Sequence, residues 1–316
     1  IRPAIYKDLK DSPKVLKNKV VPGMGNNCNR LYWWDHNYKE DNNEYSNSYS
    51  NNEEAKMAIV LAEYLMKQDT NKGEEINVTI ITTYLKQLFI IRNLLKNKYH
   101  LTLNDKDLDQ LEDFEDMEER KNNIKSSDQI IKTKITDTIK ISTLDNFQGD
   151  ESKYVILSLV RSNNDKNIGF LKIINRVNVG LSRAKNGFYI LGNSNTFTKS
   201  SFWQNIIDNL NKAKMIGNNI DIICQKHKER VSISYNQYNL FDVKAKYGGC
   251  TEPCNIQLLC GHICPKQCHP DDIEHRISTA MCLKKCTRPC IGEDNHPCNT
   301  EGCCGNHYKQ GKCPPC

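Results

Sequence analysis

The sequence lacks the features that define several whole classes of protein. Its apolar stretches, such as residues 155–160, are far shorter than the roughly 18 to 20 apolar residues of a membrane-spanning helix, which excludes a transmembrane protein. No positively charged start followed by an apolar segment opens the chain, so a secretory signal is not expected. Because the chain starts at Ile1 and not at Met, we expect it to be a fragment.

A strong excess of charge of one sign is also missing. The 316 residues carry 44 Lys plus Arg against 38 Asp plus Glu, a net charge of +6 that is too small to indicate a nucleic-acid binder. Residues 250–316 alone carry as many basic as acidic side chains, before thiolates are counted. A purely electrostatic hold of this tail on phosphates is therefore not expected, and protein contacts or base stacking would be needed instead.

Cysteine is scarce in the first 249 residues, which contain only Cys28 and Cys224, whereas 13 of the 15 cysteines lie in residues 250–316. The chain therefore has two chemically different parts. In a small secreted domain this density would indicate a disulfide framework. A long, cysteine-poor preceding part without a signal favours the reducing cell interior, and metal ligation is then the better interpretation.

The first part alternates the two hydrophobic periods that distinguish strands from helices. The pattern predicts strands at residues 30–34, 76–82, 138–144, 154–160 and 188–191, and helices at residues 52–68, 85–95, 174–184 and 198–210. Phe202 and Trp203 on the last helix are expected in the core. Alternating strands and helices imply an α/β fold with a parallel sheet and helices on both faces.

A block of like charge interrupts this alternation between about residues 101 and 134. Nine acidic side chains and one Lys lie between Asp105 and Glu119. Such blocks are usually solvated, so we interpret this segment as an inserted acidic helix or loop without an assigned role.

Two motifs of the α/β part suggest phosphate chemistry. In residues 141–161, a turn containing Phe147, Gln148, Gly149, Asp150 and Glu151 separates two predicted strands, and Gly149 permits a tight turn where a ligand approaches closely. In residues 175–193, Arg183 lies where a helix ends and a strand begins. A guanidinium there can stabilise charge on a transferred phosphoryl group, although a surface ion pair is the alternative.

At these residues the sequence resembles the second RecA-like domain of superfamily one RNA helicases of the nonsense-mediated-decay and senataxin type. Residues 147–151 match motif V (FQGxE), residues 178–184 match motif VI (NVxLSRA), and residues 81–87, ITTYLKQ, are similar to motif IV. Ile1, Arg2 and Pro3 resemble the end of the Q-x-R-M-x-P motif. In that alignment the nucleotide-contacting arginine would precede Ile1.

The resemblance implies a RecA-like (P-loop NTPase-type) fold and specific residue roles. Glu151 would contact the nucleotide ribose, Gly149 the phosphates and Arg183 the γ-phosphate, while Gln148 would support the turn. Contacts to the RNA backbone are implied, by position, for Thr83, Tyr84, Gln87, Thr143 and Asn163; packing is the alternative for Tyr84.

One motif of such enzymes is missing. The sequence contains no G-x-x-x-x-G-K-[ST] loop to hold the β- and γ-phosphates and a magnesium ion. We therefore expect no ATP hydrolysis by this chain alone. A first RecA-like domain preceding Ile1 would complete the site and bind ATP and Mg²⁺ jointly with it.

The cysteine-rich part has the composition of a zinc-stabilised fold, since thiolates and imidazoles at close spacing suit tetrahedral zinc. Large apolar residues are few, so metal binding must supply folding free energy, and the tail should unfold without zinc. The candidate ligands are Cys224, His227, Cys250, Cys254, Cys260, His262, Cys264, Cys268, His269, Cys282, Cys286, Cys290, His296, Cys298, Cys303, Cys304, His307, Cys313 and Cys316.

The pattern C-x3-C-x5-C-G-H-x-C-x3-C-H at residues 250–269 resembles zinc fingers of the NF-X type, and residues 282–298 form a looser second unit. The predicted organisation is a RecA-like body over residues 1–216, a linker over 217–249 that could hold the first ligands, and an NF-X-type tail over 250–316. These ligands could form at most five zinc sites, and three or four are expected. The sequence does not determine which ligands share an ion. His275 is expected to be a solvated loop residue.

The leading hypothesis is the C-terminal part of an ATP-dependent RNA helicase whose zinc fingers bind RNA or protein partners. One alternative is an RNA-binding scaffold with an inactive helicase body, and another is a RING-like ubiquitin-ligase tail, which the spacing disfavours. Helicases with NF-X-type fingers are linked to small-RNA silencing and antiviral defence. That resemblance implies RNA as the track and a location in cytoplasmic granules, the nucleus or both.

Overall fold

The computed structural model describes residues 20–41, 48–68, 77–122, 138–147, 149–258 and 260–270, together with six residues of the tail: Asp272, Glu274, His275, Ser278, Cys282 and Lys284. Residues 1–3, Gln148 and the candidate ligands from Cys286 to Cys316 lie outside this part. Among the described residues, no helix is long and apolar enough to cross a membrane.

The body is built on a seven-stranded sheet in the order β3-β4-β2-β5-β6-β1-β7, and all its strand pairs are parallel. The strands are β1 (Leu31–Asp35), β2 (Val78–Thr82), β3 (His100–Thr102), β4 (Thr138–Thr143), β5 (Ser152–Ser158), β6 (Ala184–Gly192) and β7 (Ile216–Gly217). The predicted α/β fold with a parallel sheet is thus confirmed. The sequence pattern did not indicate the short edge strands β3 and β7.

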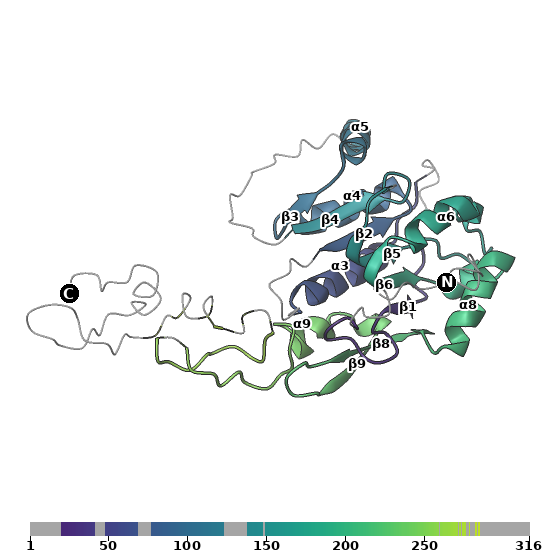
Figure 1. Ribbon diagram of the computed structural model, residues 1–316. Helices are drawn as coiled ribbons and strands as arrows, with labels where there is room; N and C mark the ends of the chain where they lie inside the picture. The colour runs from purple at the N-terminus through teal and green to yellow at the C-terminus, as the bar shows by residue number, and fades with distance from the viewer. Residues whose placement is uncertain are drawn as a thin grey trace, which may run out of the picture.

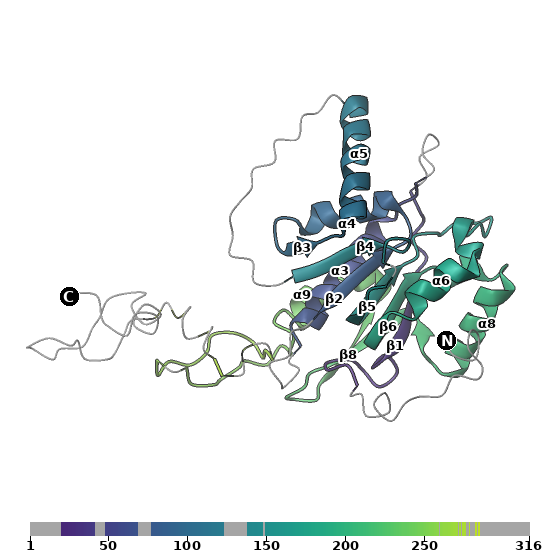
Figure 2. The same ribbon diagram turned by 45° about the horizontal axis from the view of Figure 1, so that its top comes forward.

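Helices cover both faces of the sheet (Figures 1 and 2). One face packs against α3 (Asn52–Met66) and α4 (Leu85–Leu95). The other packs against the 3₁₀ turn η1 (Gly169–Lys172), α6 (Ile174–Leu181), α7 (Ser194–Phe197) and α8 (Ser201–Lys212). Neighbouring residues in a strand point to opposite faces. Accordingly Trp34 contributes to the first core and Trp33, packed edge-on against Trp203 and Phe197, to the second.

Two predicted helices have different limits in the structure. The helix expected over 174–184 ends at Leu181, because Ala184 already pairs with Ser152 as the first residue of β6. The helix expected over 198–210 begins only at Ser201, as α8, because Ser200 is in an extended conformation; the short helix α7, which ends at Phe197, precedes it and was not expected. Trp203 is fully buried, as expected, and Phe202 is half-buried against the same core.

The segment expected as a linker, residues 217–249, is folded against the body. It contains a hairpin of β8 (Asn219–Ile223) and β9 (Arg230–Ser234) and the short helix α9 (Leu240–Lys244). Ile220, Ile222 and Ile233 of the hairpin belong to the core on the α3 side. Phe241 of α9 packs against Trp34 and Tyr64. The body therefore extends up to the first cysteine of the tail.

The acidic segment begins with β3 and continues as α5 (Asp105–Asn122), which projects away from the sheet in Figure 2. Most of the described acidic side chains of α5 are exposed, as expected for a solvated block. Asp107 differs, because it is completely buried beneath the end of β4. The segment is therefore anchored to the body by Asp107, together with the pairing of β3 and the buried side chain of Leu111.

Candidate functional site

The residues expected to face the nucleotide lie at the amino edge of the sheet. Glu151 directly precedes β5 and Arg183 directly precedes β6, and these two strands pair in parallel. The Ser152 amide donates to the Arg183 carbonyl oxygen at 3.1 Å. Glu151 and Arg183 are thereby brought to neighbouring positions, 32 residues apart in the chain.

Charged side chains of both signs lie at this edge. The exposed Glu151 carboxylate lies 3.0 Å from the Lys185 ammonium, and Arg183 is half-buried. Gly149 has φ +93°, a conformation that favours glycine, and a Cβ built there would meet nothing within 4 Å. The turn thus leaves open space around Gly149.

The residues expected to contact RNA lie at the opposite, carboxyl edge. Thr83 and Tyr84 follow β2, Thr143 ends β4, and Asn163 lies five residues beyond the end of β5. Because β5 has seven residues, the two edges are about 20 Å apart. In open α/β sheets, ligands bind outside the carboxyl ends of the strands. The sequence motifs therefore separate into two groups at two edges.

Most of these carboxyl-edge side chains are already engaged within the protein. Thr83 Oγ1 donates to the Leu159 carbonyl at 3.0 Å. Tyr84 is buried, stacks near Phe170 and accepts a hydrogen bond from Arg161; burial raises the pKa of its hydroxyl although the Arg161 guanidinium opposes this. Asn163 donates to Glu40 at 3.1 Å and to the Asn167 carbonyl at 2.8 Å. The packing alternative for Tyr84 therefore has direct support.

Gln87, for which an RNA contact was expected, is enclosed within the protein in this conformation. The side chain is 0% exposed. Its amide accepts from the Asn51 backbone at 2.8 Å and donates to the Asn51 carbonyl and to Ser158 Oγ, both at 3.1 Å. Gln87 therefore joins the start of α3 to α4 and β5, and presents no surface to a ligand.

A buried carboxylate that sequence reasoning missed shapes the loop after β5. Glu54 is completely buried; its Oε1 accepts from Ser158 Oγ at 2.5 Å and from the Val160 amide at 2.9 Å, and its Oε2 lies 2.8 Å from His36 Nε2. Val160 has φ +69°, which is strained for a β-branched residue. Glu54 therefore holds the turn that leads to Asn163. The sequence signal for Glu54 was Asn51, three residues earlier: an Asn followed three residues later by a Glu is typical of a helix start, which places Glu54 in the first turn of α3.

The same loop is fixed from outside by Glu40 and Arg161. The Arg161 Nε donates to Glu40 Oε2 at 3.0 Å, and the guanidinium lies 3.8 Å from the centre of the Tyr49 ring. The Ser162 amide also donates to Glu40, at 2.6 Å. Arg161 is only 3% exposed, so its role is to position the loop and not to contact a ligand.

The cysteine-rich tail gathers its described ligands into three groups. The first, here called cluster A, contains Cys224, His227, Cys250 and Cys268. Cluster B contains Cys254, Cys264, His269 and His275. Cluster C contains Cys260, His262 and Cys282. Cys224 and His227 come from the turn between β8 and β9, so cluster A joins the body to the tail.

The clusters interleave along the chain. Cys268 belongs to cluster A and the adjacent His269 to cluster B, while the two cysteines of cluster B enclose the Cys260 and His262 of cluster C. His275 is not the solvated residue that we expected. It is 3% exposed, and its Nε2 lies 3.0 Å from Cys254 Sγ.

The distances within the clusters fit tetrahedral metal coordination. Cys224 and Cys268 have their sulfurs 3.7 Å apart, far longer than the roughly 2.05 Å of a disulfide. Sulfur–nitrogen distances run from 3.0 Å, for Cys250 and His227, to 3.8 Å, for Cys224 and His227. Zinc–ligand bonds of about 2.0 to 2.3 Å predict tetrahedral edges of about 3.3 to 3.8 Å, which most of these distances match and which the 3.0 Å between Cys250 and His227 falls slightly below. Clusters A and B each supply four such ligands.

Hydrogen bonds adjust the acidity of these thiols. Burial raises the pKa of Cys264, but the Lys266 amide and the His269 ring outweigh it and leave this pKa below its ordinary value. Burial raises the pKa of Cys250 to about 12, with Cys224 as a charged neighbour. Outside the clusters, burial raises the pKa of Cys28 to about 11, so this thiol is not a reactive group.

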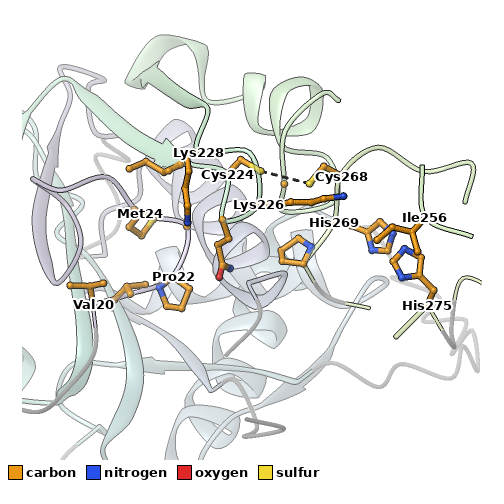
Figure 3. A pocket seen from close by; sticks show the side chains of 16 residues that line it. Val20, Pro22, Met24, Cys224, Lys226, Lys228, Ile256, Cys268, His269 and His275 are labelled. Atoms are coloured by element: carbon orange, nitrogen blue, oxygen red, sulfur yellow. Dashed lines mark hydrogen bonds between the residues drawn. The ribbon is translucent and has the colours of Figure 1, made fainter. Parts of the chain in front are cut away.

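A cavity of about 550 Å³ lies where the body meets the tail (Figure 3). Val20, Pro22 and Met24 line one side of it, and the ligands Cys224, Cys268 and His269 line another. Residues of the body and of clusters A and B thus line one cavity.

Residues 3–195 match the model of the AAA domain family, and the chain belongs to that family. The relatives narrow the class to superfamily one helicases with NF-X-type zinc fingers, as the motifs indicated. NFX1-type zinc finger-containing protein 1 of Mus musculus is 32% identical over 298 residues, which is 94% of this chain and 13% of the mouse protein.

Two further relatives match a smaller share of the chain. The Helicase required for RNAi-mediated heterochromatin assembly 1 of Schizosaccharomyces pombe is 31% identical over 208 residues, 66% of this chain and 17% of that protein. Helicase SEN1 of Saccharomyces cerevisiae is 28% identical over 172 residues, 54% of this chain and 6% of that protein. The chain thus spans a small part of each of these relatives.

Proposed function

We propose that this chain is the second RecA-like domain and the zinc-finger tail of an ATP-dependent RNA helicase. Its amino edge would form one wall of an ATP site, with Glu151 at the ribose, Gly149 at the phosphates and Arg183 at the γ-phosphate. Its carboxyl edge would face RNA. The observation that carries the proposal is the separation of the two motif groups to two edges of one sheet.

With ATP at the amino edge and RNA at the carboxyl edge, ATP hydrolysis would be coupled to RNA binding in a simple cycle. A partner domain carrying the phosphate-binding loop would supply the other wall of the site, together with Mg²⁺. Arg183, at the start of β6, would stabilise the charge that develops on the γ-phosphoryl group during hydrolysis. Closure and opening of the cleft would then change how the carboxyl edge holds RNA.

The tail is proposed to bind zinc through clusters A, B and C. Thiolate and imidazole ligands in groups of four are typical of structural zinc sites, which contribute folding free energy directly. Since the tail is almost neutral in charge, we propose protein partners for it, or RNA bound by stacking. A role in RNA silencing or surveillance, inside the cell, is proposed from the names of the relatives.

The test is RNA-stimulated ATP hydrolysis by the full-length protein. Arg183→Ala should lower kcat by about 10³-fold or more, the scale of losses reported for arginine fingers, and leave RNA binding intact. Arg230→Ala, which removes an exposed arginine from β9 outside the sheet, is the matched control and should retain hydrolysis. Full hydrolysis by Arg183→Ala would overturn the assignment. No hydrolysis by the unaltered protein, with RNA binding intact, would favour an RNA-binding scaffold.

A further inference from the structure

The acidic segment places one buried carboxylate, Asp107, at the carboxyl edge of the sheet. Donors from β4 and from the turn after it surround this carboxylate. Asp107 is 0% exposed. Its Oδ1 accepts from Thr143 Oγ1 and from Asn146 Nδ2, each at 2.7 Å, and its Oδ2 accepts from Ser142 Oγ at 2.7 Å and from the Thr143 amide at 3.2 Å. Both the backbone and the side chain of Thr143 are thereby fixed.

The position of Asp107 is itself held by its neighbours. Asn104 caps the start of α5, accepting from the Asp107 amide at 2.7 Å. The Asn104 amide also donates to Ser142 Oγ at 3.2 Å and to the Asn146 carbonyl at 3.1 Å. Asp107 is therefore pre-organised, and it cannot turn away from Thr143 without breaking several hydrogen bonds.

This arrangement decides how the Thr143 hydroxyl can interact with a ligand. A hydroxyl group has one proton and two lone pairs, whereas a carboxylate only accepts. The single Thr143 proton is directed to Asp107, so toward a ligand Oγ1 can act only as an acceptor. Thr143 as a whole residue is 8% exposed, so it keeps a small accessible area at the carboxyl edge.

The backbone of a nucleic acid offers few donors to such an acceptor. Phosphate oxygens and the ring oxygen of the sugar only accept, and the ribose 2′-hydroxyl is the one group of the backbone that donates. We propose that Thr143 accepts a hydrogen bond from a ribose 2′-hydroxyl and so makes the carboxyl edge favour RNA over DNA. This inference rests on the proposed function, in which that edge faces the nucleic acid.

The experiment compares the affinity of the full-length protein for three fluorescein-labelled 12-nucleotide oligouridines at one salt concentration: ribo, 2′-deoxy and 2′-fluoro. The 2′-fluoro sugar keeps the ribose pucker but has no proton to donate. The ribo form should bind about three- to tenfold tighter than the 2′-fluoro form, the value of one net hydrogen bond. Thr143→Val should bring this ratio close to one, while affinity for the 2′-fluoro form stays nearly unchanged.

Two variants separate this specific effect from damage to the fold. Thr143→Ser keeps the hydroxyl and should restore the ratio. Ser142→Ala removes a different hydroxyl from the same carboxylate and should leave the ratio as in the unaltered protein. A ratio that persists in Thr143→Val, or that is already close to one in the unaltered protein, would overturn the inference. RNA-stimulated ATP hydrolysis, measured in parallel, reports on the proposed function separately.

Discussion

At the scale of single residues, buried carboxylates organise the loops that carry the candidate sites. Glu54 holds the strained turn at Val160, and Asp107 holds the end of β4. Both are completely buried, and both use each carboxylate oxygen for hydrogen bonds. Such groups cost desolvation energy, which these hydrogen bonds offset.

The importance of Glu54 can be measured by truncation. Glu54→Ala would leave the Val160 amide and the Ser158 hydroxyl buried without their acceptor, and would remove the partner of His36. We expect the free energy of unfolding to fall by about 3 kcal/mol or more. Urea unfolding of the 316-residue chain measures this change.

Its neighbour Glu53 provides the matched control. Glu53 contacts Lys56 and Tyr238 near the surface, and its side chain is 37% exposed. Glu53→Ala should change the free energy of unfolding by about 1 kcal/mol or less. Equal losses in the two variants would contradict the role given to Glu54.

At the scale of elements, periodicity located most of the sheet and its helices. Residues 85–95 form a helix with the predicted limits, because Tyr84 is extended and Leu88, Ile91 and Leu95 all face the core. The start of α8 was predicted three residues too early, since hydrophobic period alone does not reveal that Ser200 is extended, and the short helix α7 was missed. The hairpin of β8 and β9 was missed because its apolar residues are interrupted by Asn, Asp and Ser and it lies next to candidate metal ligands, so the segment was interpreted as a linker.

Some features of the candidate site could likewise be predicted from the sequence, and others could not. The motifs predicted that Glu151 and Arg183 belong to one site, and the parallel pairing of β5 and β6 brings them together. Burial of Gln87 and of Asp107 could not be predicted, because it depends on which face of a helix the remaining fold covers. The partition of zinc ligands could not be predicted either, since the neighbours Cys268 and His269 belong to different clusters.

The tail should depend on its metal clusters and the body should not. Cys260→Ser removes a ligand of cluster C, so we expect lower zinc content by mass spectrometry and faster proteolysis of the tail. The thermal unfolding of the body should change little. Cys28→Ser, which alters a buried cysteine outside the clusters, should retain the full zinc content. A tail that kept both its metal and its protease resistance in Cys260→Ser would refute this expectation.

At the scale of the whole molecule, one sheet connects three functional regions. The amino ends of β5 and β6 carry the proposed nucleotide contacts, and the carboxyl ends of β2, β4 and β5 carry the proposed RNA contacts. Cluster A fastens the tail to the hairpin that packs against the same core (Figure 1).

The central claim is that the two edges serve different ligands, and steady-state ATP hydrolysis by the full-length protein over a range of RNA concentrations tests it most directly. Arg183→Ala should abolish kcat while the RNA dissociation constant stays the same. Thr143→Val should raise the RNA concentration that gives half-maximal hydrolysis about three- to tenfold and leave kcat at saturating RNA nearly unchanged. If both variants changed the same parameter, or if Arg183→Ala hydrolysed ATP normally, the assignment of one ligand to each edge would be contradicted.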